Sequence, residues 1–418
     1  MLILANTLIC NGGTTFILRM AKAYASEGDK LGVLVLTDSY DEQLLDQIQL
    51  AADVYFLKDY VPAFYSTGSQ LDIFMPYCKP SLSSVISLYG NHVHAIGVFG
   101  LLFSALCAKR GIKDVSVSAG VYHQNEYMYK NVNAYFSTVA YDFFAAMGAP
   151  SVVFFNENCI ASYTSFFKRD YSCSPLLPIG IELPDLSGEA IRREGFRIVS
   201  IGNLHPFKTY NENIISIMPS LLEVNSGVTY EIYGEGGNED NLKRQVKGLG
   251  IEDAVFFKGT VGYDKLNSIL RNAFLFVGSG TAILESSALG VPSLIGIESI
   301  KQAVTYGFLS AAEGFSYHEE VQGKTLYNMQ DMIVEILEDE QAWNKRSLEC
   351  QRKAEDFSVR HTFLGFKKVE VSARVITPEE VNNISSMRLM LSFIWSAIKH
   401  KLGLDKEFAE RRNQGSIV

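Results

Sequence analysis

This 418-residue sequence lacks several features that would assign it to a common class. Its six cysteines form no CxxC pair and have no histidine at metal-ligand spacing, which argues against a structural zinc site and favours reduced thiols. No apolar run reaches about 18 residues, so we expect no membrane-spanning helix. A net charge of −9 argues against a nucleic-acid partner, which would need a basic face.

The first ten residues are apolar, but they lack a basic leader and run directly into Asn11, Gly12 and Gly13. A secretory signal begins with basic residues and has a longer apolar stretch. We therefore interpret this stretch as a buried strand and expect a cytoplasmic protein.

Short apolar runs alternate with amphipathic stretches along most of the chain, which predicts βαβ units and parallel sheets covered by helices. The alternation restarts after residues 171–189, a Pro- and Gly-rich segment typical of an interdomain linker. We expect an α/β protein of two Rossmann-like, doubly wound domains that face a cleft, residues 1–184 and 185–365. Residues 366–418 should form C-terminal helices.

The expected elements are placed from these runs. The expected strands are residues 2–8, 31–36, 93–99 and 115–118, then 197–201, 229–233, 254–257, 274–277 and 292–296. The expected helices are residues 14–26 and 101–109, then 213–224, 238–249, 263–272 and 282–289.

One segment, FLFVGSGTAILESSALGVP, combines an apolar strand, a glycine turn and a helix. Glycines at the carboxyl end of a strand let a ligand approach the backbone, and the helix start offers unpaired N–H groups to an anion. The turn consists of Gly278, Ser279, Gly280 and Thr281. Glu285 follows one helical turn later, where it could accept hydrogen bonds from a ribose or simply be a solvated helix residue.

Three further turns follow strands in the same half, within VSIGNLHPFKTY, EIYGEG and VFFKGTV. In the first, Lys208 is placed to bind a diphosphate, although a lone lysine is normally a solvated surface charge. Gly234 opens the second turn. Thr260 and Val261 follow the third strand, where the backbone could contact a nucleobase. All four turns lie at carboxyl ends of strands, where open α/β sheets bind ligands.

In this order the four motifs resemble the donor domain of GT-B fold glycosyltransferases, and most of all retaining family four, the glycosyl transferases group 1. The resemblance covers about residues 195–295 and is weaker over the N-terminal half. It implies that Glu285 is the second glutamate of the family's E-x7-E motif and holds the donor ribose. It also implies that the amides of residues 278–281 face the diphosphate and donor sugar, and that Lys208 binds phosphate.

Two positions depart from the family pattern. Val277 stands where the first glutamate of E-x7-E belongs, and Asn203 stands where an arginine usually follows Gly202. These changes leave the donor sugar and the catalytic rate open. We still expect Asn203 to line the donor site.

The N-terminal half fits the acceptor domain of the same family. Gly12 and Gly13 resemble its first glycine loop, which approaches the donor phosphates, or form an ordinary strand–helix turn. His94 and His123 align with histidines near the family's active site and could bind a hydroxyl or phosphate, or move a proton. The alternative for His94 is a hydrogen-bonded core residue. The aromatic segment 55–77 could form an acceptor wall or belong to the core.

Residues 385–402, SSMRLMLSFIWSAIKHKL, have apolar residues at helical spacing, with a tryptophan and basic residues. Such a helix packs on the body of the protein, forms an oligomer contact, or lies in a membrane interface. The last possibility would place the protein at the inner face of the plasma membrane.

The combined prediction is a metal-independent glycosyltransferase without a cofactor. It would use a UDP- or GDP-linked sugar as donor and a glycan or polyprenyl-linked acceptor in cell-surface polysaccharide biosynthesis, such as capsule or O-antigen. The alternatives are a sugar-nucleotide epimerase or phosphorylase of the same fold, and a catalytically weak nucleotide-sugar-binding subunit. A dinucleotide oxidoreductase is disfavoured, because the first turn reads NGGTTF rather than GxGxxG.

Overall fold

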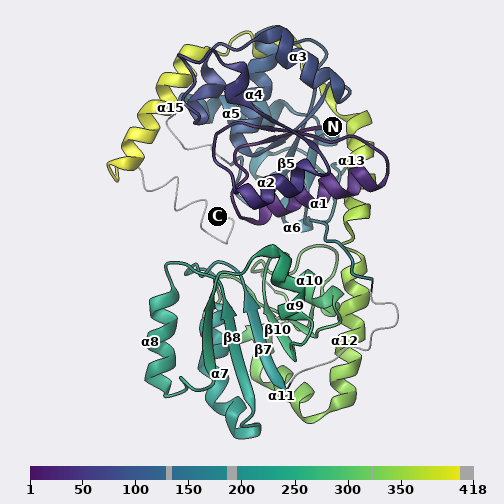
Figure 1. The fold of residues 1–418 in the computed structure, drawn as a ribbon, viewed down its shortest axis with the longest axis vertical. Coiled ribbons are helices and arrows are strands. Elements are labelled where there is room, and N and C mark those ends of the chain that lie inside the picture. Colours follow the sequence, from purple (N-terminus) through teal and green to yellow (C-terminus); the bar gives the residue numbers. More distant parts are fainter. Residues whose placement is uncertain (129–133, 186–194, 322, 405–418) are drawn as a thin grey trace. The chain divides into compact units, whose positions relative to one another are not determined.

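The computed structural model describes residues 1–128, 134–185, 195–321 and 323–404. The chain divides into two compact units, and Figure 1 shows both. Unit 1 consists of Met1–Gly180 together with the described residues from Val359 onward, and unit 2 consists of Ile181–Ser358. The chain therefore leaves unit 1 once and later returns to it.

Unit 1 is built on a seven-stranded sheet in the order β14-β5-β4-β1-β2-β3, with β6 also paired to β5. All pairs are parallel except that of β14 with β5. The strands are β1 (Leu2–Ala5), β2 (Gly32–Val35), β3 (Asp53–Phe56), β4 (His92–Ile96), β5 (Ser116–Val121), β6 (Val152–Phe154) and β14 (Arg374–Val375). The central strands β1 and β2 are buried at every residue, as expected for parallel strands with helices on both faces.

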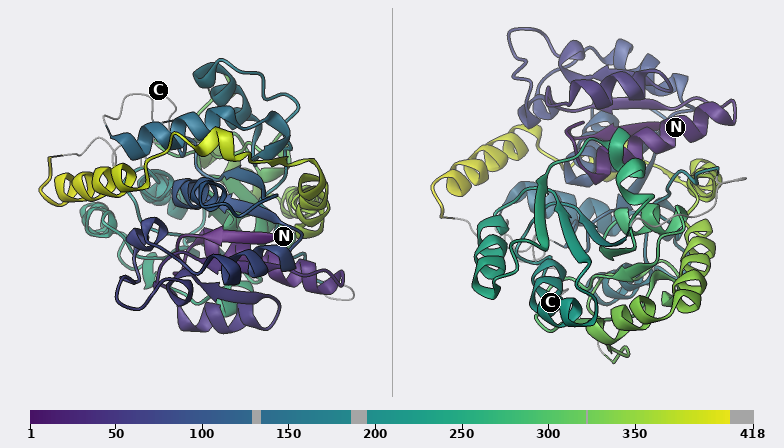
Figure 2. Two further views of the ribbon diagram at one scale, coloured as in Figure 1. Left: turned by 90° about the horizontal axis from the view of Figure 1, so that it is seen from above. Right: turned by 60° about the horizontal axis from the view of Figure 1, so that its bottom comes forward.

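Nine α-helices of unit 1 lie within the described residues. They are α1 (Gly12–Ser26), α2 (Glu42–Gln49), α3 (Lys79–Leu88), α4 (Gly97–Lys109), α5 (Tyr135–Ala146), α6 (Glu157–Phe167), α13 (Val359–Ser372), α14 (Pro378–Val381) and α15 (Ser386–Lys401). Helix α13 packs against α1, and α15 packs against α5, as Figure 2 shows for the yellow C-terminal helix.

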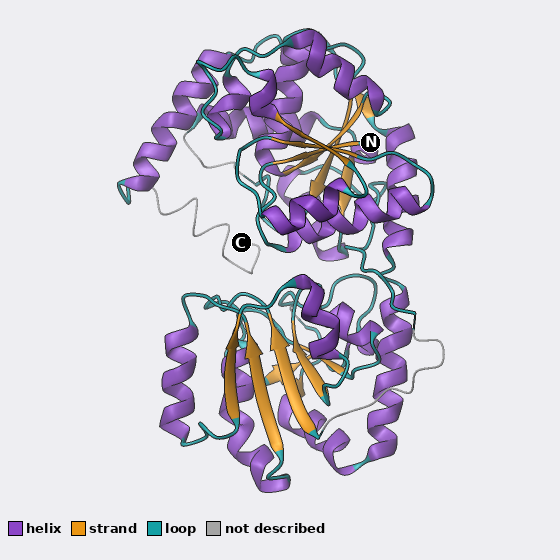
Figure 3. Ribbon diagram, in the orientation of Figure 1, coloured by secondary structure: helices purple, strands orange, loops and turns teal. Residues whose placement is uncertain are grey.

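Unit 2 is built on a five-stranded parallel sheet in the order β11-β10-β7-β8-β9. Its strands are β7 (Phe196–Ile201), β8 (Val228–Tyr233), β9 (Val255–Gly259), β10 (Leu275–Gly278) and β11 (Ser293–Ile295), with a separate pair β12 (Val304–Thr305) and β13 (Tyr327–Asn328). Its helices are α7 (Tyr210–Val224), α8 (Glu239–Leu249), α9 (Leu266–Leu270), α10 (Ala282–Ala288), α11 (Met329–Glu338) and α12 (Glu340–Glu355). In Figure 3 the arrowheads of this sheet point the same way, toward the loops of one edge.

Side-chain caps fix where several helices begin. Asn11 accepts a hydrogen bond from the N–H of Thr14 at the start of α1, and Asn156 does the same for Cys159 in α6. Ser385 caps α15 through the N–H of Arg388. Each such cap is worth about 1 kcal/mol, because it satisfies an N–H group that has no partner within the helix.

Each unit has its own hydrophobic core, made of the inward faces of its helices and both faces of its sheet. Burying one large apolar side chain contributes about 1.5–3 kcal/mol, so the two cores account for two units that are each compact. The α/β class and the doubly wound sheets predicted from the sequence are confirmed.

Some boundaries differ from the sequence prediction. The first strand ends at Ala5 rather than residue 8, because its pairing with β2 ends at Val35. The proposed linker is ordered along part of its length, since Phe154 of β6 accepts a hydrogen bond from the N–H of Leu177. Residues 186–189 of that segment lie outside the described residues, as do residues 405–418 of the tail.

Candidate functional site

The four sequence motifs, with their candidate site residues, lie in and beside the loops at the carboxyl edge of the unit 2 sheet. Two of these loops are locked together. The N–H of Gly202, after β7, donates to the C=O of Tyr233, and the N–H of Gly234, after β8, donates to the C=O of Gly259. A Cβ atom at Gly234 would lie 2.0 Å from the oxygen of Gly202, and its φ is +133°. Glycine is therefore required there by close backbone approach and by conformation.

Lys208 lies against the first of these glycines. Its Nζ is 3.0 Å from the position that a Cβ of Gly202 would occupy, and the side chain is half-buried. In the described part of the chain Lys208 pairs with no carboxylate. This arrangement leaves an ammonium group beside the backbone of Gly202 without a carboxylate partner, which suits a phosphate. Asn203, between the two residues, is exposed.

The turn after β10 offers backbone donors. Gly280 has φ +66°, and a Cβ atom at this residue would meet nothing within 4 Å, so its surroundings are open. Its C=O accepts a hydrogen bond from the hydroxyl of Tyr317 at 2.8 Å. The N–H groups of Gly280, Thr281 and Ala282 have no backbone acceptor among the described residues. Several donors therefore remain for a ligand at this turn.

Glu285 lies on α10 and is only 8% exposed. Its Oε1 accepts a hydrogen bond from the hydroxyl of Tyr263 at 3.3 Å. The predicted ribose contact requires a carboxylate held at this edge of the sheet, and α10 holds Glu285 within one turn of Thr281. Thr260 is exposed and Val261 half-buried, and both directly follow β9 at the same edge.

Val277, which replaces the first glutamate of E-x7-E, is fully buried in β10 and paired with Leu294 of β11. A different carboxylate reaches the same turn. The hydroxyl of Ser279 donates to Oε1 of Glu298 at 2.7 Å. The sequence analysis missed Glu298, although its position three residues after β11 places it at the carboxyl edge by the same rule that found the other turns.

Glu298 is also connected to the loop that carries Lys208. The N–H of Ser299, whose φ is +67°, donates to the C=O of Phe207 at 2.7 Å. The loops after β7, β10 and β11 therefore form one connected edge. It brings together a lysine, two glutamates and backbone amides that can donate to a ligand.

In unit 1 the first glycine loop lies at the carboxyl end of β1. Gly12 and Gly13 form the first turn of α1 rather than a separate loop, with Asn11 as its cap. A Cβ at Gly12 would meet nothing within 4 Å. The backbone at Gly12 is therefore open to a ligand.

His123 lies in the loop after β5 and is exposed. Glu126 organises this loop, because its Oε2 accepts hydrogen bonds from the N–H of Tyr122 at 2.8 Å and of His123 at 3.3 Å. The loop follows the carboxyl end of β5. In the sheet β5 pairs with β4, and β4 pairs with β1, so this loop and the first glycine turn lie at the same edge of the sheet. His123 is therefore placed where a ligand at this edge could reach its side chain.

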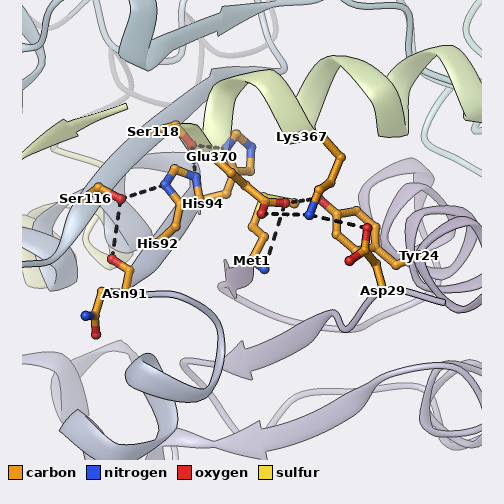
Figure 4. A network of polar contacts seen from close by, with 10 residues as sticks. All are labelled: Met1, Tyr24, Asp29, Asn91, His92, His94, Ser116, Ser118, Lys367 and Glu370. Atoms are coloured by element: carbon orange, nitrogen blue, oxygen red, sulfur yellow. Dashed lines mark hydrogen bonds and ion pairs between the residues drawn. The ribbon is translucent and has the colours of Figure 1, made fainter. Parts of the chain in front are cut away.

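His94 has a different environment, shown in Figure 4. It is fully buried within β4, with Nδ1 2.8 Å from the hydroxyl of Ser118 and Nε2 2.8 Å from the hydroxyl of Tyr122. Phe366 of α13 packs on its ring. Burial lowers the pKa of His94 to about 3, because desolvation disfavours the imidazolium. This placement favours the alternative of a hydrogen-bonded core residue.

Most of the aromatic segment 55–77 is at least partly buried, but Phe64 is 80% exposed and Tyr65 43% exposed. Their ring centroids are 3.8 Å apart. Asp72, itself fully buried, fixes the loop by accepting from the N–H of Gly68 at 3.0 Å and from other loop groups. Gly68 in turn accepts from the N–H of Asp38, just after β2, which holds the loop near that strand end.

No metal centre is evident in the described ranges, where three or more His, Cys, Asp or Glu side chains nowhere gather as they would around an ion. Among the described helices, none is both long and apolar enough to cross a bilayer.

Comparison with known proteins links this geometry to a family. Residues 187–303 match the family model described as glycosyl transferases group 1. Mannosylfructose-phosphate synthase from Agrobacterium fabrum is 32% identical over 129 residues, which make up 27% of this chain. The match spans only 28% of that relative's own length.

Solved structures resemble most of the chain in fold. Anabaena HepE in complex with UDP has a TM-score of 0.62 at 16% identity, covering 88% of this chain and 98% of HepE. Sucrose-phosphate synthase from Thermosynechococcus elongatus has a TM-score of 0.60 at 12% identity, covering 88% and 97%. TarM from S. aureus, in a complex that contains UDP, has a TM-score of 0.62 at 9% identity, covering 88% and 99%.

Proposed function

The chain carries a glycosyl transferases group 1 domain in a GT-B fold, and from this premise we propose that it transfers a sugar from a nucleotide-sugar donor to a glycan or lipid-linked acceptor. The observation that supports this most is the connected edge of the unit 2 sheet, where Lys208 and the amides of residues 280–282 follow strand ends and Glu285 lies in the first turns of α10. The HepE and TarM structures contain UDP, which makes a UDP-linked donor the first to test, with GDP-linked sugars next.

Each group at this edge has a role in sugar transfer. Negative charge grows on the leaving diphosphate as the anomeric C–O bond breaks. Lys208 and the amides of residues 280–282 stabilise that charge without a metal ion. Glu285 accepts hydrogen bonds from the ribose hydroxyls, and the backbone at Thr260 and Val261 contacts the nucleobase.

Glu298 supplies the carboxylate that Val277 cannot. Its side chain reaches Ser279, in the turn where the resemblance places the donor sugar. Sugar hydroxyls are hydrogen-bond donors, and an ionised carboxylate is a strong acceptor for them. Glu298 therefore binds the donor sugar, and Glu298→Gln should raise the KM for the sugar nucleotide more than the Kd for the nucleotide alone.

The transfer retains anomeric configuration by attack on the same face from which the phosphate leaves, with that phosphate helping to deprotonate the acceptor. A covalent glycosyl-enzyme at position 277 is chemically impossible, because valine has no nucleophile. His123 hydrogen-bonds the acceptor hydroxyl or the donor phosphate. The exposed rings of Phe64 and Tyr65 offer an apolar surface on which an acceptor sugar can stack.

An acceptor of this kind belongs to cell-surface polysaccharide biosynthesis, with capsule and O-antigen as the classes considered. A lipid-linked acceptor would bring the enzyme to the cytoplasmic face of a membrane. The six free cysteines, three of them exposed, agree with a reducing compartment.

A donor screen tests binding first. A donor at a hundred times its Kd should raise the free energy of unfolding by about 2.7 kcal/mol, which a thermal-shift measurement with UDP-, GDP-, dTDP- and CMP-sugars would detect. If no nucleotide sugar raises the Tm, the proposed donor site is wrong.

Turnover tests the chemistry. Lys208→Ala should lower turnover at least about tenfold with the fold intact, because a charge on the leaving diphosphate loses its partner. Lys247→Ala, an exposed lysine on α8, is the matched control and should leave turnover unchanged. Near-wild-type turnover in Lys208→Ala would contradict the assignment.

A catalytically weak binding subunit is the second candidate, favoured by the buried Val277 and by Asn203 in place of an arginine. Such a subunit would bind nucleotide in the thermal-shift screen and transfer nothing. An epimerase would instead convert the donor with no acceptor present, so product analysis with donor alone separates an epimerase from the other two.

A further inference from the structure

Helix α15 exposes an apolar stripe on its outward face. Met387 is 71% exposed, Leu391 57%, Trp395 59%, Ile398 42% and Leu402 66%. These positions follow one another at spacings of three and four residues, so they form one continuous line along the helix. We call this line, residues 387, 391, 395, 398 and 402, the outer stripe.

The outer stripe is not needed to attach α15 to unit 1. The opposite face does that, with Leu389 fully buried. The ring of Phe393 lies 5.7 Å from that of Phe74, 5.5 Å from that of Phe99 and 5.9 Å from that of Phe136. The hydroxyl of Ser392 accepts a hydrogen bond from the N–H of Phe136. The helix is therefore apolar on two faces, and within the described residues of unit 1 only the inner face is packed.

The charge of α15 is opposite to that of the whole chain. Residues 386–401 contain Arg388, Lys399, His400 and Lys401 and no acidic residue, whereas the chain has a net charge of −9. On a helical wheel Lys399 lies along one border of the outer stripe and Lys401 along the other. Arg388 lies on the same border as Lys399, but its guanidinium packs on the ring of Tyr135, 4.2 Å from the centroid. Nζ of Lys399 lies 5.8 Å from the centroid of the Trp395 ring.

We propose that the outer stripe of α15 docks on an anionic lipid surface, with the helix lying in the plane of the membrane. Apolar side chains with a tryptophan insert between the headgroups, and the flanking basic side chains pair with lipid phosphates. A protein partner would need an acidic groove, whereas a lipid surface satisfies the apolar stripe and both basic borders at once. At 16 residues α15 is too short to span a bilayer, so the contact is peripheral.

Tryptophan fluorescence offers a direct test, because the sequence has two tryptophans in opposite settings. Trp343 is 4% exposed in unit 2, and Trp395 lies on the outer stripe. Vesicles of phosphatidylcholine mixed with phosphatidylglycerol should shift the emission of the full chain to shorter wavelength. Brominated lipids should quench it, and vesicles of phosphatidylcholine alone should give a much smaller change.

Variants assign the contact to the stripe. Leu391→Gln with Trp395→Gln should weaken co-sedimentation with the mixed vesicles about tenfold or more, since two inserted side chains are lost. Leu50→Gln with Leu88→Gln is the matched control, because both leucines are exposed in unit 1 but lie on other helices or their ends. Trp395→Phe keeps an apolar ring and should retain most of the binding.

Salt concentration and the removal of charged side chains measure how much electrostatic attraction contributes to vesicle binding. Lys399→Gln with Lys401→Gln should reduce binding to the mixed vesicles and reduce its dependence on salt concentration. The donor thermal shift should be unchanged in every α15 variant, so failure of this proposal and failure of the glycosyltransferase assignment are distinguishable.

Two outcomes would overturn the proposal. One is equal sedimentation of wild type and the Leu391, Trp395 double variant with the mixed vesicles. The other is a concentration-dependent dimer, seen by sedimentation velocity, that the double variant abolishes while vesicles bind neither protein; the stripe would then be an interface between two copies of the chain.

Discussion

The two parallel sheets of this protein use their polar residues in different places. In unit 2 the polar groups lie beyond the strand ends, where Lys208 is half-buried and the surroundings of Gly280 are open. In unit 1 a polar network lies inside the sheet, where His92 and His94 share the hydroxyl of Ser118. The difference indicates that a polar residue near an apolar strand is available to a ligand where the strand has ended before it, and is taken up by the core where it has not.

The largest effect should follow from breaking the loop contact in unit 2. Gly234→Ala would place a methyl group 2.0 Å from the oxygen of Gly202 and at φ +133°, so the loops after β7 and β8 must separate. We expect a loss of about 3 kcal/mol or more in the free energy of unfolding and no measurable nucleotide binding. Urea denaturation and nucleotide titration measure the two.

Gly237→Ala is the control for that change, because a Cβ at Gly237 meets nothing within 4 Å and its φ is not positive. It should leave both quantities near wild type. If both substitutions changed stability and nucleotide binding equally, the contact between the loops after β7 and β8 would not be what maintains the site.

Acid should destabilise unit 1 through its buried network. Burial lowers the pKa of both His92 and His94 to about 3. In the unfolded chain they titrate near 6.5, so below that pH the unfolded state binds more protons and the stability they contribute falls as pH falls toward 3. At pH 5 the loss should be about 2 kcal/mol for each histidine.

Denaturation at pH 7.5 and pH 5 measures that loss, with the buried Trp343 reporting on unit 2 and amide hydrogen exchange in β4 and β5 reporting on unit 1. The midpoint for unit 1 should fall more steeply with acid, and His94→Gln should flatten its slope. A slope that His94→Gln leaves unchanged would mean that this histidine does not titrate on unfolding.

Substitutions of the two candidate histidines compare a side chain exposed after a strand with one buried within a strand. His123→Ala should lower kcat about tenfold with little change in Tm, because His123 is exposed at a strand end. His94→Gln should lower Tm, because two buried hydrogen bonds are disturbed. Loss of kcat in His94→Gln at unchanged Tm would instead support the catalytic role that the resemblance suggested.

The smallest effect should come from Glu285→Gln. Wild type should prefer a ribonucleoside diphosphate over its 2′-deoxy analogue, and the variant should lose most of that preference, a change of about 1 kcal/mol. Glu252→Gln, an exposed residue of unit 2, is the control and should keep the preference. Calorimetric titration with both nucleotides measures it.

The sequence determined much of the fold, because parallel strands buried on both faces leave continuous apolar runs that end in glycine. The runs at β7, β8, β9, β10 and β11 were placed within two residues of their observed bounds. The run 93–99 was less informative. It contains most of β4 and the start of α4 at Gly97, and periodicity cannot separate a buried strand from a buried helix.

Only the tertiary structure showed which of the candidate site residues are accessible to a ligand. Sequence spacing gave Glu285 and Lys208 their places after strands, but it could not show that Glu298 reaches Ser279, since that contact crosses from one loop to the next. Nor could it show that both ring nitrogens of His94 are occupied, or that α15 turns one apolar face inward and another outward. Local pattern follows from the period of helix and strand, whereas burial depends on the neighbours that folding brings from far along the chain.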